Sequence, residues 1–472
     1  MTDRLAPPSG DVAGLPRGRG WDLLILCLCV YMLTSVARLH QLFPILSLVR
    51  PVAVAGLLAI GLFLLDRVPR RRLGPLQLRA TRYLIAFLVW MALSVPGALW
   101  PGGAFATFVD FLKTALISLV IISAVRSVRD VERLTLIYFI GAVIFAAVVL
   151  SRTTFQLAVG GRMERLYFYD SNDFATYAIT AMPLGLYFAA SERRLWMRGL
   201  AWGGIALLAA GFIWSGSRGG FLAFIAVIAY FLLRYTSVKQ SWRWSAVAVM
   251  ALLVTAIAGD AYWERINTVL RPTQDYNMTD DQGRMRLWRR GVGYMIEHPV
   301  LGVGAGNFPR AEGTISPLVG RMPRGRTVKW GPPHNSYVQV GAELGLVGLL
   351  IFAAFLFNVF RTLGAVRSAA GPPGPLGREA TRLAQSLTAS LIGFVVGSFF
   401  LTLAYHDIVY TLTGLALGLR LVTVNARDPL HDYSLVSDNM TLLETGRSVQ
   451  NRARSRSPLR RKSSRICDGT TG

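Results

Sequence analysis

Long apolar runs, each about the length of a membrane-spanning helix, recur through most of this 472-residue chain. The hydrocarbon core of a bilayer is about 30 Å thick, and about 20 apolar helical residues cross it. Lipid offers the backbone no hydrogen-bond partners, so only helices and closed barrels span it, and these runs are too long for barrel strands. Twelve spanning helices are predicted, near residues 21–38, 45–65, 83–99, 105–124, 134–150, 174–190, 199–214, 219–233, 244–258, 337–359, 384–403 and 408–424. The predicted fold class is therefore an all-α polytopic membrane protein with one large loop between helices nine and ten.

The composition agrees with this fold class and narrows the partners. Hydrophobic residues make up 53% of the chain and charged residues only 16%, which is typical of an integral membrane protein. A net charge of +24 would suggest nucleic acid binding in a soluble protein. The arginines instead lie mostly in short loops between apolar runs, where they anchor a membrane protein. We expect a membrane environment and no nucleic acid, for which only the basic stretch 452–465 argues.

Cysteine usage predicts neither a disulfide nor a metal site. Cys27 and Cys29 lie inside the first apolar run and Cys467 lies near the C-terminus, with no histidine at metal-ligand spacing. The sequence also lacks the short motifs that bind nucleotides or catalytic metals, so no cofactor is expected.

The loops between the runs indicate how the chain crosses the membrane. Residues 66–82 contain six arginines and residues 125–133 contain three, whereas 100–104 and 404–407 contain no lysine or arginine. Positively charged loops remain in the cytoplasm, so both termini are predicted to be cytoplasmic and the long loop to lie outside. The predicted organisation is a cytoplasmic N-terminus (1–20), helices one to nine (21–258), an outer catalytic loop (259–336), helices ten to twelve (337–424) and a disordered basic cytoplasmic tail (425–472).

Arginines in the outward segments run against this charge rule and need another explanation. They occur in residues 151–173, in the turn at 214–220 and in the long loop, which holds eleven Lys and Arg against seven Asp and Glu. Binding of an anionic ligand is one such explanation. Arg218, flanked by glycines in that turn, is either an interfacial anchor or part of an anion site.

Residues 283–298 are predicted to form a helix on the membrane surface, with an apolar and a charged face. The apolar stripe consists of Met285, Trp288, Val292 and Met295, and the charged face consists of Arg286, Arg289, Arg290 and Glu297. Arg284 projects into the apolar face, so it either lies against the protein body as a functional residue or snorkels outward. The other three arginines are expected to face water or lipid headgroups.

His334 lies three residues before the tenth predicted helix, directly after two prolines. Histidine exchanges a proton near neutral pH, so His334 is a candidate general base beside the arginines, although it could instead cap the helix. Asn335, the next residue, is a supporting candidate.

Four further polar residues near the outer side are candidates. Glu343, two turns into the tenth helix, is either functional or holds an arginine by an ion pair. Asp173 comes directly before the sixth helix and could cap it or contact a substrate. His406 and Asp407, in the last outward turn, could pair with His334 or with a substrate.

The chain resembles the O-antigen ligase-related family over about residues 205–360. Three stretches carry the resemblance: SGSRGG at 215–220, HPVLGVGAGNF at 298–308 and HNSYVQVGAELGLVGLL at 334–350. The family comprises O-antigen ligases, Wzy-type polysaccharide polymerases and bacterial protein O-oligosaccharyltransferases. The resemblance implies a GT-C-like glycosyltransferase of the bacterial inner membrane, with its active loop in the periplasm and no metal.

The resemblance also implies a substrate, a glycan linked to undecaprenyl diphosphate, that is transferred to a hydroxyl group. Arg218 and Arg284 would hold the diphosphate, with Arg286 as the alternative to Arg284, and His334 would activate the acceptor. Guanidinium groups match phosphate oxygens in pairs and keep their charge, so two of them can replace a divalent cation.

The acceptor stays open between lipid A–core, another lipid-linked glycan and a protein Ser or Thr. A transporter or flippase is the alternative of a different class. Transporters generally keep charged sites near the midplane of repeated halves, whereas the unusual charges here gather at one face.

Overall fold

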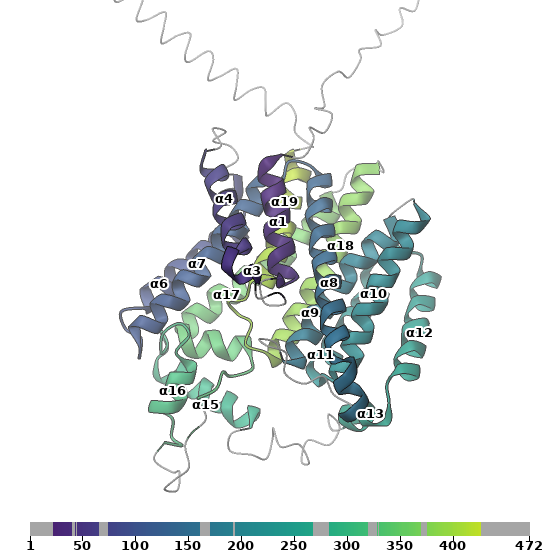
Figure 1. The fold of residues 1–472 in the computed structure, drawn as a ribbon. Coiled ribbons are helices and arrows are strands. Elements are labelled where there is room, and N and C mark those ends of the chain that lie inside the picture. Colours follow the sequence, from purple (N-terminus) through teal and green to yellow (C-terminus); the bar gives the residue numbers. More distant parts are fainter. Residues whose placement is uncertain are drawn as a thin grey trace, which may run out of the picture. The chain divides into compact units, whose positions relative to one another are not determined.

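The structure is a computed structural model that describes residues 22–39, 43, 45–65, 74–160, 170–191, 194–267, 283–319, 328, 330–369 and 375–425. Over these residues the regular structure is helical, with no strand (Figure 1). The chain divides into two units after residue 423, and every site discussed below belongs to the first. The predicted N-terminal segment 1–20, and the predicted tail beyond its first residue, lie outside the described residues.

A helix is present over each of the twelve ranges predicted from the apolar runs. The helices are α1 (Leu23–Val36), α3 (Ile45–Val49) with α4 (Pro51–Leu65), α6 (Arg79–Ser94), α7 (Pro101–Ala124), α8 (Val128–Gly160), α9 (Ser171–Ser191), α10 (Leu195–Ser215), α11 (Arg218–Arg234), α12 (Gln240–Ile257), α17 (Ser336–Ala369), α18 (Pro375–Gly397) and α19 (Asp407–Asn425). In the described part of the chain, α7, α8, α9, α10, α17, α18 and α19 are long and apolar enough to cross a membrane. The prediction of an all-α polytopic membrane protein is confirmed, and membrane crossing by the other helices stays a prediction.

Several observed helices differ from the predicted ranges in length or continuity, among them those at 45–65 and 134–150. The range 45–65 is divided at Arg50, whose φ is 46°, because Pro51 disfavours the α-helical conformation in the residue before it. The range 134–150 continues to Gly160, so the helix extends into what the sequence assigns to an outward loop.

The interior is most completely buried around α9, which contacts α8, α10, α11 and α18 (Figure 1). Glycines let these helices approach closely. A methyl group at Gly185 of α9 would overlap the Phe139 ring of α8, and one at Gly204 of α10 would lie 2.8 Å from that ring. Small residues at helix contacts are typical of membrane bundles, where close van der Waals packing drives association.

The described part of the long loop contributes three short helices, which lie at one end of the helix bundle in Figure 1. They are α13 (Asp260–Asn267), α15 (Arg284–Glu297) and α16 (Phe308–Thr314). Both α15 and α16 contact α17, and α17 also contacts the 3₁₀ turn η4 (Ser398–Phe400) that follows α18. The loop is therefore joined to the bundle at the first turns of α17.

Candidate active site

The motif loop, residues 299–308, docks onto a break in α17. The break lies at Gly345 (φ 72°, ψ −178°), in a conformation that is essentially restricted to glycine. The hydrogen bonds across it run from Val303 N to Ala342 O (2.9 Å), from Gly304 N to Glu343 O (2.9 Å), from Trp90 Nε1 to Leu344 O (3.0 Å) and from Leu346 N to Pro299 O (2.8 Å). The carbonyl groups of Ala342 and Glu343, which a continuous helix would use internally, thus bind the loop, and that of Leu344 binds Trp90 of α6. The tenth predicted helix is therefore interrupted for a structural reason.

Glu343 holds the same loop through its side chain. The residue is 2% exposed, and its carboxylate accepts hydrogen bonds from the backbone N–H groups of Gly306 (2.9 Å) and Phe308 (3.3 Å). A buried carboxylate requires such donors. The partners of this carboxylate thus include backbone groups of the loop, and within the described residues no arginine pairs with it, unlike the ion pair that the sequence left open.

The buried face of α15 differs from the predicted one. Its buried residues are Leu287, Gly291 and Tyr294. Met285 and Val292, from the predicted apolar stripe, are each 41% exposed. The contact depends on Gly291, where a methyl group would overlap Val338 of α17 and lie 2.8 Å from the Phe308 ring. Hydrophobic periodicity cannot reveal a face whose central residue is glycine.

The position of Arg290 also differs from the prediction, which placed its side chain on a face of this helix toward water or lipid headgroups. Its guanidinium group binds both carboxylate oxygens of Glu312 at 2.6 to 3.0 Å. The Glu312 side chain is 1% exposed and also accepts a hydrogen bond from the Tyr294 hydroxyl (2.8 Å). Burial raises the pKa of the Tyr294 phenol, so it stays protonated as a donor. Arg286 and Arg289, from the same predicted face, are exposed.

His334 has a left-handed backbone conformation, with φ 51°, directly before α17. Its N–H donates to Thr402 Oγ1 (2.9 Å). The cap of α17 is Asn335, whose Oδ1 accepts from the N–H groups of Tyr337 (2.9 Å) and Val338 (3.0 Å). Positive φ is uncommon outside glycine and persists only where the surroundings fix it. Asn335 thus performs the capping that the sequence left open for His334, whose side chain is half-buried.

One short segment, residues 398–402, contacts the three elements that carry the predicted site. Its contacts are Thr402 with His334 N, Leu401 O with Ser336 Oγ (2.8 Å), the Phe399 ring with the Trp288 ring (centroids 5.3 Å apart) and Phe400 with Gly219. Trp288 Nε1 also donates to Pro333 O (2.8 Å), beside His334. The starts of α11 and α17, and the first turns of α15, therefore meet at this segment.

Arg218 and Arg284 are the first residues of two of these helices. Before Arg218, Gly216 ends α10 in a left-handed conformation (φ 56°) and the Ser217 hydroxyl accepts from Gly220 N–H (3.0 Å). This turn places Arg218 beside Gly219, where a methyl group would lie 2.7 Å from Phe400. Arg218 and Arg284 are both half-buried. The structure thus brings the elements that carry Arg218, Arg284 and His334 to one segment.

Asp173 takes part in a cap at the start of α9. Asp170 Oδ1 accepts from the N–H groups of Asn172 (2.7 Å) and Asp173 (3.0 Å), and Asp173 Oδ2 accepts from Asp170 N–H (3.3 Å). These reciprocal bonds are those of a capping box. Of the two roles that the sequence left open, capping is observed, and substrate contact stays a prediction.

A second polar cluster joins the end of α1 to the start of α19. Arg38 Nη2 lies 2.7 Å from His406 Nε2, His406 Nδ1 lies 2.7 Å from Asp407 Oδ1, and Ser35 Oγ donates to Asp407 Oδ2 at 2.7 Å. Because a guanidinium group only donates, His406 accepts at Nε2 and carries its proton on Nδ1. The sequence pointed to His406 and Asp407 but not to Arg38, since one arginine at the end of an apolar run resembles an interfacial anchor.

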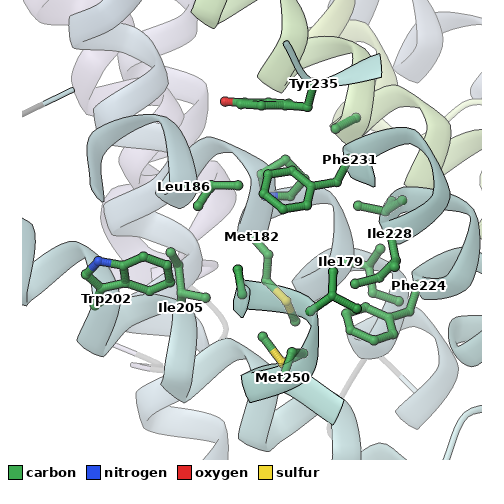
Figure 2. A pocket seen from close by; sticks show the side chains of 15 residues that line it. Ile179, Met182, Leu186, Trp202, Ile205, Phe224, Ile228, Phe231, Tyr235 and Met250 are labelled. Atoms are coloured by element: carbon green, nitrogen blue, oxygen red, sulfur yellow. The ribbon is translucent and has the colours of Figure 1, made fainter. Parts of the chain in front are cut away.

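An apolar pocket of about 100 Å³ lies between α9, α10, α11 and α12 (Figure 2). Figure 2 shows Met182, Trp202, Phe231 and Met250 around it. None of the described residues that line it is charged. The α11 part of the lining runs from Phe224 to Phe231, ~9 to ~20 Å along the helix from Arg218 at the usual helical rise. The pocket suits a hydrocarbon chain and lies apart from the polar site.

Part of the chain matches a known protein family. The family model described as O-antigen ligase matches residues 203–353. This range contains Arg218, Arg284, the motif loop, His334 and the break at Gly345. No curated protein matches the chain.

Proposed function

We propose that this chain, whose residues 203–353 match the O-antigen ligase family model, moves a glycan from undecaprenyl diphosphate to an acceptor hydroxyl at the periplasmic face of the membrane. The match supports glycan transfer or polymerisation in a membrane. The observation that carries the finer proposal is the meeting of α11, α15 and α17 at residues 398–402, with Arg218, Arg284 and His334 at or beside the first residues of those helices.

The two arginines suit a diphosphate leaving group. A glycosyl diphosphate is already activated, so its departure requires stabilisation of negative charge and not protonation. Guanidinium groups donate hydrogen bonds to phosphate oxygens in pairs and stay charged at any physiological pH. In this proposal Arg218 and Arg284 bind the diphosphate from two helices and hold it as it separates from the sugar.

His334 suits the role of general base. The acceptor oxygen attacks the anomeric carbon from the face opposite the diphosphate, the bond from that carbon to the diphosphate oxygen breaks, and the imidazole takes the acceptor proton. Attack from the opposite face inverts the anomeric configuration. Proton transfer to a positioned side chain is typically worth about 10²–10⁴ in rate, and the left-handed conformation of His334, fixed by Thr402, supplies that positioning.

The lipid chain of the donor requires an apolar place within the bundle. The pocket between α9, α10, α11 and α12 has that character (Figure 2). Helix α11, which lines it, begins at Arg218. In this arrangement the donor diphosphate lies at the start of α11, and part of its lipid chain lies in the pocket farther along the same helix.

A purified reaction tests the proposal. The full-length protein in detergent is mixed with an undecaprenyl diphosphate-linked oligosaccharide and, separately, with lipid A–core, a second lipid-linked glycan or a Ser/Thr peptide. We expect one acceptor to be glycosylated with inverted configuration, in the presence of EDTA. If EDTA abolished transfer and Mg²⁺ or Mn²⁺ restored it, the reaction would need a metal ion. The proposal that the two arginines stabilise the diphosphate in place of a metal would then be wrong.

The same reaction separates ligase, polymerase and protein transferase by the acceptor that is used. Movement of intact donor across a proteoliposome membrane, without a glycosylated product, would instead support the transporter alternative.

A further inference from the structure

Two exposed tryptophan rings flank one arginine where the long loop meets the turn between α6 and α7. The guanidinium carbon of Arg310, in α16, lies 5.9 Å from the centroid of the Trp100 ring and 5.5 Å from that of the Trp330 ring. Trp100 is 55% exposed and Trp330 is 54% exposed. We call these three residues the tryptophan–arginine platform. A single exposed ring is ordinary, but rings that gather at the surface are typical of a binding site.

Each ring of the platform packs on a glycine. A methyl group at Gly103 of α7 would overlap the Trp100 ring, and one at Gly313 of α16 would overlap the Trp330 ring. Because no side chain lies between them, each ring comes close to a helix backbone. More than half of each tryptophan nevertheless remains open to solvent. The rings are therefore positioned by packing and still accessible to a ligand.

Arg310 has hydrogen-bonding capacity that the protein does not use. Its guanidinium group contacts the two rings, and within the described part of the chain no carboxylate or carbonyl group accepts a hydrogen bond from it. The arginine side chain carries five N–H donors, and each indole ring carries one more. The platform thus offers donors beside open aromatic surface.

Aromatic surface beside hydrogen-bond donors matches a saccharide. The C–H groups on one face of a sugar ring are apolar and stack on an indole ring, while the sugar hydroxyl groups accept from the N–H donors around it. An acidic sugar would also pair its carboxylate with the guanidinium group.

Membrane anchoring explains the platform less well. Anchoring tryptophans lie at the ends of spanning helices, at the level of the headgroups. Trp100 has such a place, directly before α7, but Trp330 belongs to the long loop. Two rings from separate parts of the chain that share one guanidinium group form a composite site, which anchoring does not require.

The platform is joined to the candidate active site on two sides. Trp330 precedes His334 by four residues, so their Cα atoms are at most ~14 Å apart. The carbonyl group of Trp100 accepts a hydrogen bond from Asn307 Nδ2 (3.3 Å), within the motif loop. Arg310 follows that loop by two residues. A chain of sugars that begins beside His334 can therefore extend onto the platform.

We propose that the tryptophan–arginine platform is a saccharide-binding site that holds sugars of the glycan away from the reacting carbon. This rests on the proposed function, in which Arg218 and Arg284 bind the diphosphate and His334 activates the acceptor. The sugars stack on the two rings and accept hydrogen bonds from Arg310, so the protein prefers an oligosaccharide to a single sugar. The three platform residues are positioning residues, because none of them lies at the reacting atoms.

Binding to the full-length protein in detergent tests this inference. The first probe is the undecaprenyl diphosphate-linked oligosaccharide isolated from the cells that produce the protein. The second is the same lipid with one sugar, and the third is undecaprenyl diphosphate without sugar. The wild type should bind the oligosaccharide probe about tenfold more tightly than the single-sugar probe.

Substitutions in the platform should remove this preference. Trp330→Ala and Arg310→Gln should each weaken binding of the oligosaccharide probe by about threefold to tenfold, with unchanged binding of the other two probes. Trp330→Tyr keeps an aromatic face and should retain most of the affinity. The matched control is Trp242→Ala, which removes a 68% exposed ring from the start of α12 and should change no affinity.

Steady-state rates identify which glycan occupies the platform. In Trp330→Ala, a raised KM for the donor with unchanged kcat would assign the sugars of the donor, and a raised KM for a glycan acceptor would assign those of the acceptor. Either result supports the site. Arg218→Gln should weaken binding of all three probes. If Arg218→Gln changed nothing while Trp330→Ala weakened the oligosaccharide probe, the diphosphate assignment would fail and the platform would stand.

Three results would overturn the platform proposal. The first is equal binding of the oligosaccharide probe and sugar-free undecaprenyl diphosphate by the wild type. The second is unchanged binding of the oligosaccharide probe in both Trp330→Ala and Arg310→Gln. The third is an equal loss of all three probes in these variants, or a loss of protein inserted in the membrane, since either would indicate a structural or anchoring role.

Discussion

The two faces of α15 hold charged residues in different ways. On one face, Arg290 is bound by both carboxylate oxygens of Glu312, whose side chain is almost completely buried. On the other, Trp288 contacts Phe399 and donates to Pro333 O, beside His334, whose N–H is bound by Thr402. Arg284, the first residue of α15, and His334 are both half-buried. In the first arrangement a positive charge is paired with a buried carboxylate of the protein. In the second, the side chains stay partly exposed, so a ligand can contact them. One polar segment thus contains charges that stabilise the fold and charges that are placed for a substrate.

The largest effect on glycan transfer should come from the residues placed for a substrate, above all His334. His334→Ala should lower the rate of glycan transfer by about 10²–10⁴-fold, because the acceptor loses its base, while thermal unfolding of the purified protein stays unchanged. Initial rates with saturating donor and acceptor measure this. His298→Ala is the matched control, since His298 is exposed at the end of α15 and should keep its activity. Full activity in His334→Ala would remove this histidine from the mechanism.

Substitution in the pair Arg290–Glu312, which stabilises the fold, should lower stability first and activity only as a result. Glu312→Gln leaves the Arg290 charge buried without its carboxylate, and breaking a buried pair typically costs about 3–5 kcal/mol. We expect a lower unfolding temperature and faster proteolysis of the long loop, with loss of transfer only as a consequence. Glu297→Gln removes an exposed carboxylate from the same helix and should be neutral. A stable but inactive Glu312→Gln variant would assign this pair to the substrate instead.

The substrate side can be resolved further by its two neighbouring arginines. Arg284→Gln should weaken binding of undecaprenyl diphosphate about tenfold to a hundredfold, the range expected for hydrogen bonds to a charged group. Arg286→Gln should have little effect, because Arg286 is exposed whereas Arg284 is half-buried. Binding measured for both variants, with unchanged unfolding temperatures, compares the two positions directly. The reverse ranking would assign the phosphate contact to Arg286.

The positions of the helices followed from the sequence because each spanning helix must present a long apolar run to lipid, and helix is present over all twelve predicted ranges. The buried face of α15 did not follow. Its central contact is made by Gly291, which has no side chain for a periodicity argument to detect. The pairing of Arg290 with Glu312 was equally hidden, because it joins residues on separate short helices of the loop.

In the candidate site, too, some residues could be predicted from the sequence and others could not. Charge on the wrong side of the membrane indicated Arg218 and Arg284, and proton chemistry indicated His334. The segment 398–402 that lies between their helices could not be inferred, because Thr402 and Phe400 act through contacts with residues far away in the chain. Local patterns identify reactive side chains, whereas the elements that position them depend on tertiary packing.

The smallest expected effect is that of a substitution at Gly345. The break at this residue supports both the pair Arg290–Glu312 and the start of α17 beside His334. The break at this residue receives the motif loop, which leads to α16 and Glu312, and it follows the first turns of α17 that begin beside His334. Gly345→Ala would force a side chain into a conformation that typically costs about 1–3 kcal/mol, and its methyl group would overlap the backbone of Val300. Stability and transfer should therefore fall together, unlike in the His334 variant.

Gly364→Ala, in a helical part of α17 where a methyl group meets no atom within 4 Å, should be neutral or stabilising by about 0.5–1 kcal/mol. Unfolding temperature and transfer rate, measured side by side for the two glycine variants, decide the point. If Gly345→Ala kept the stability of the wild type and lost only transfer, the break would belong to the substrate side alone. The two faces of α15 would then not share it as a common support.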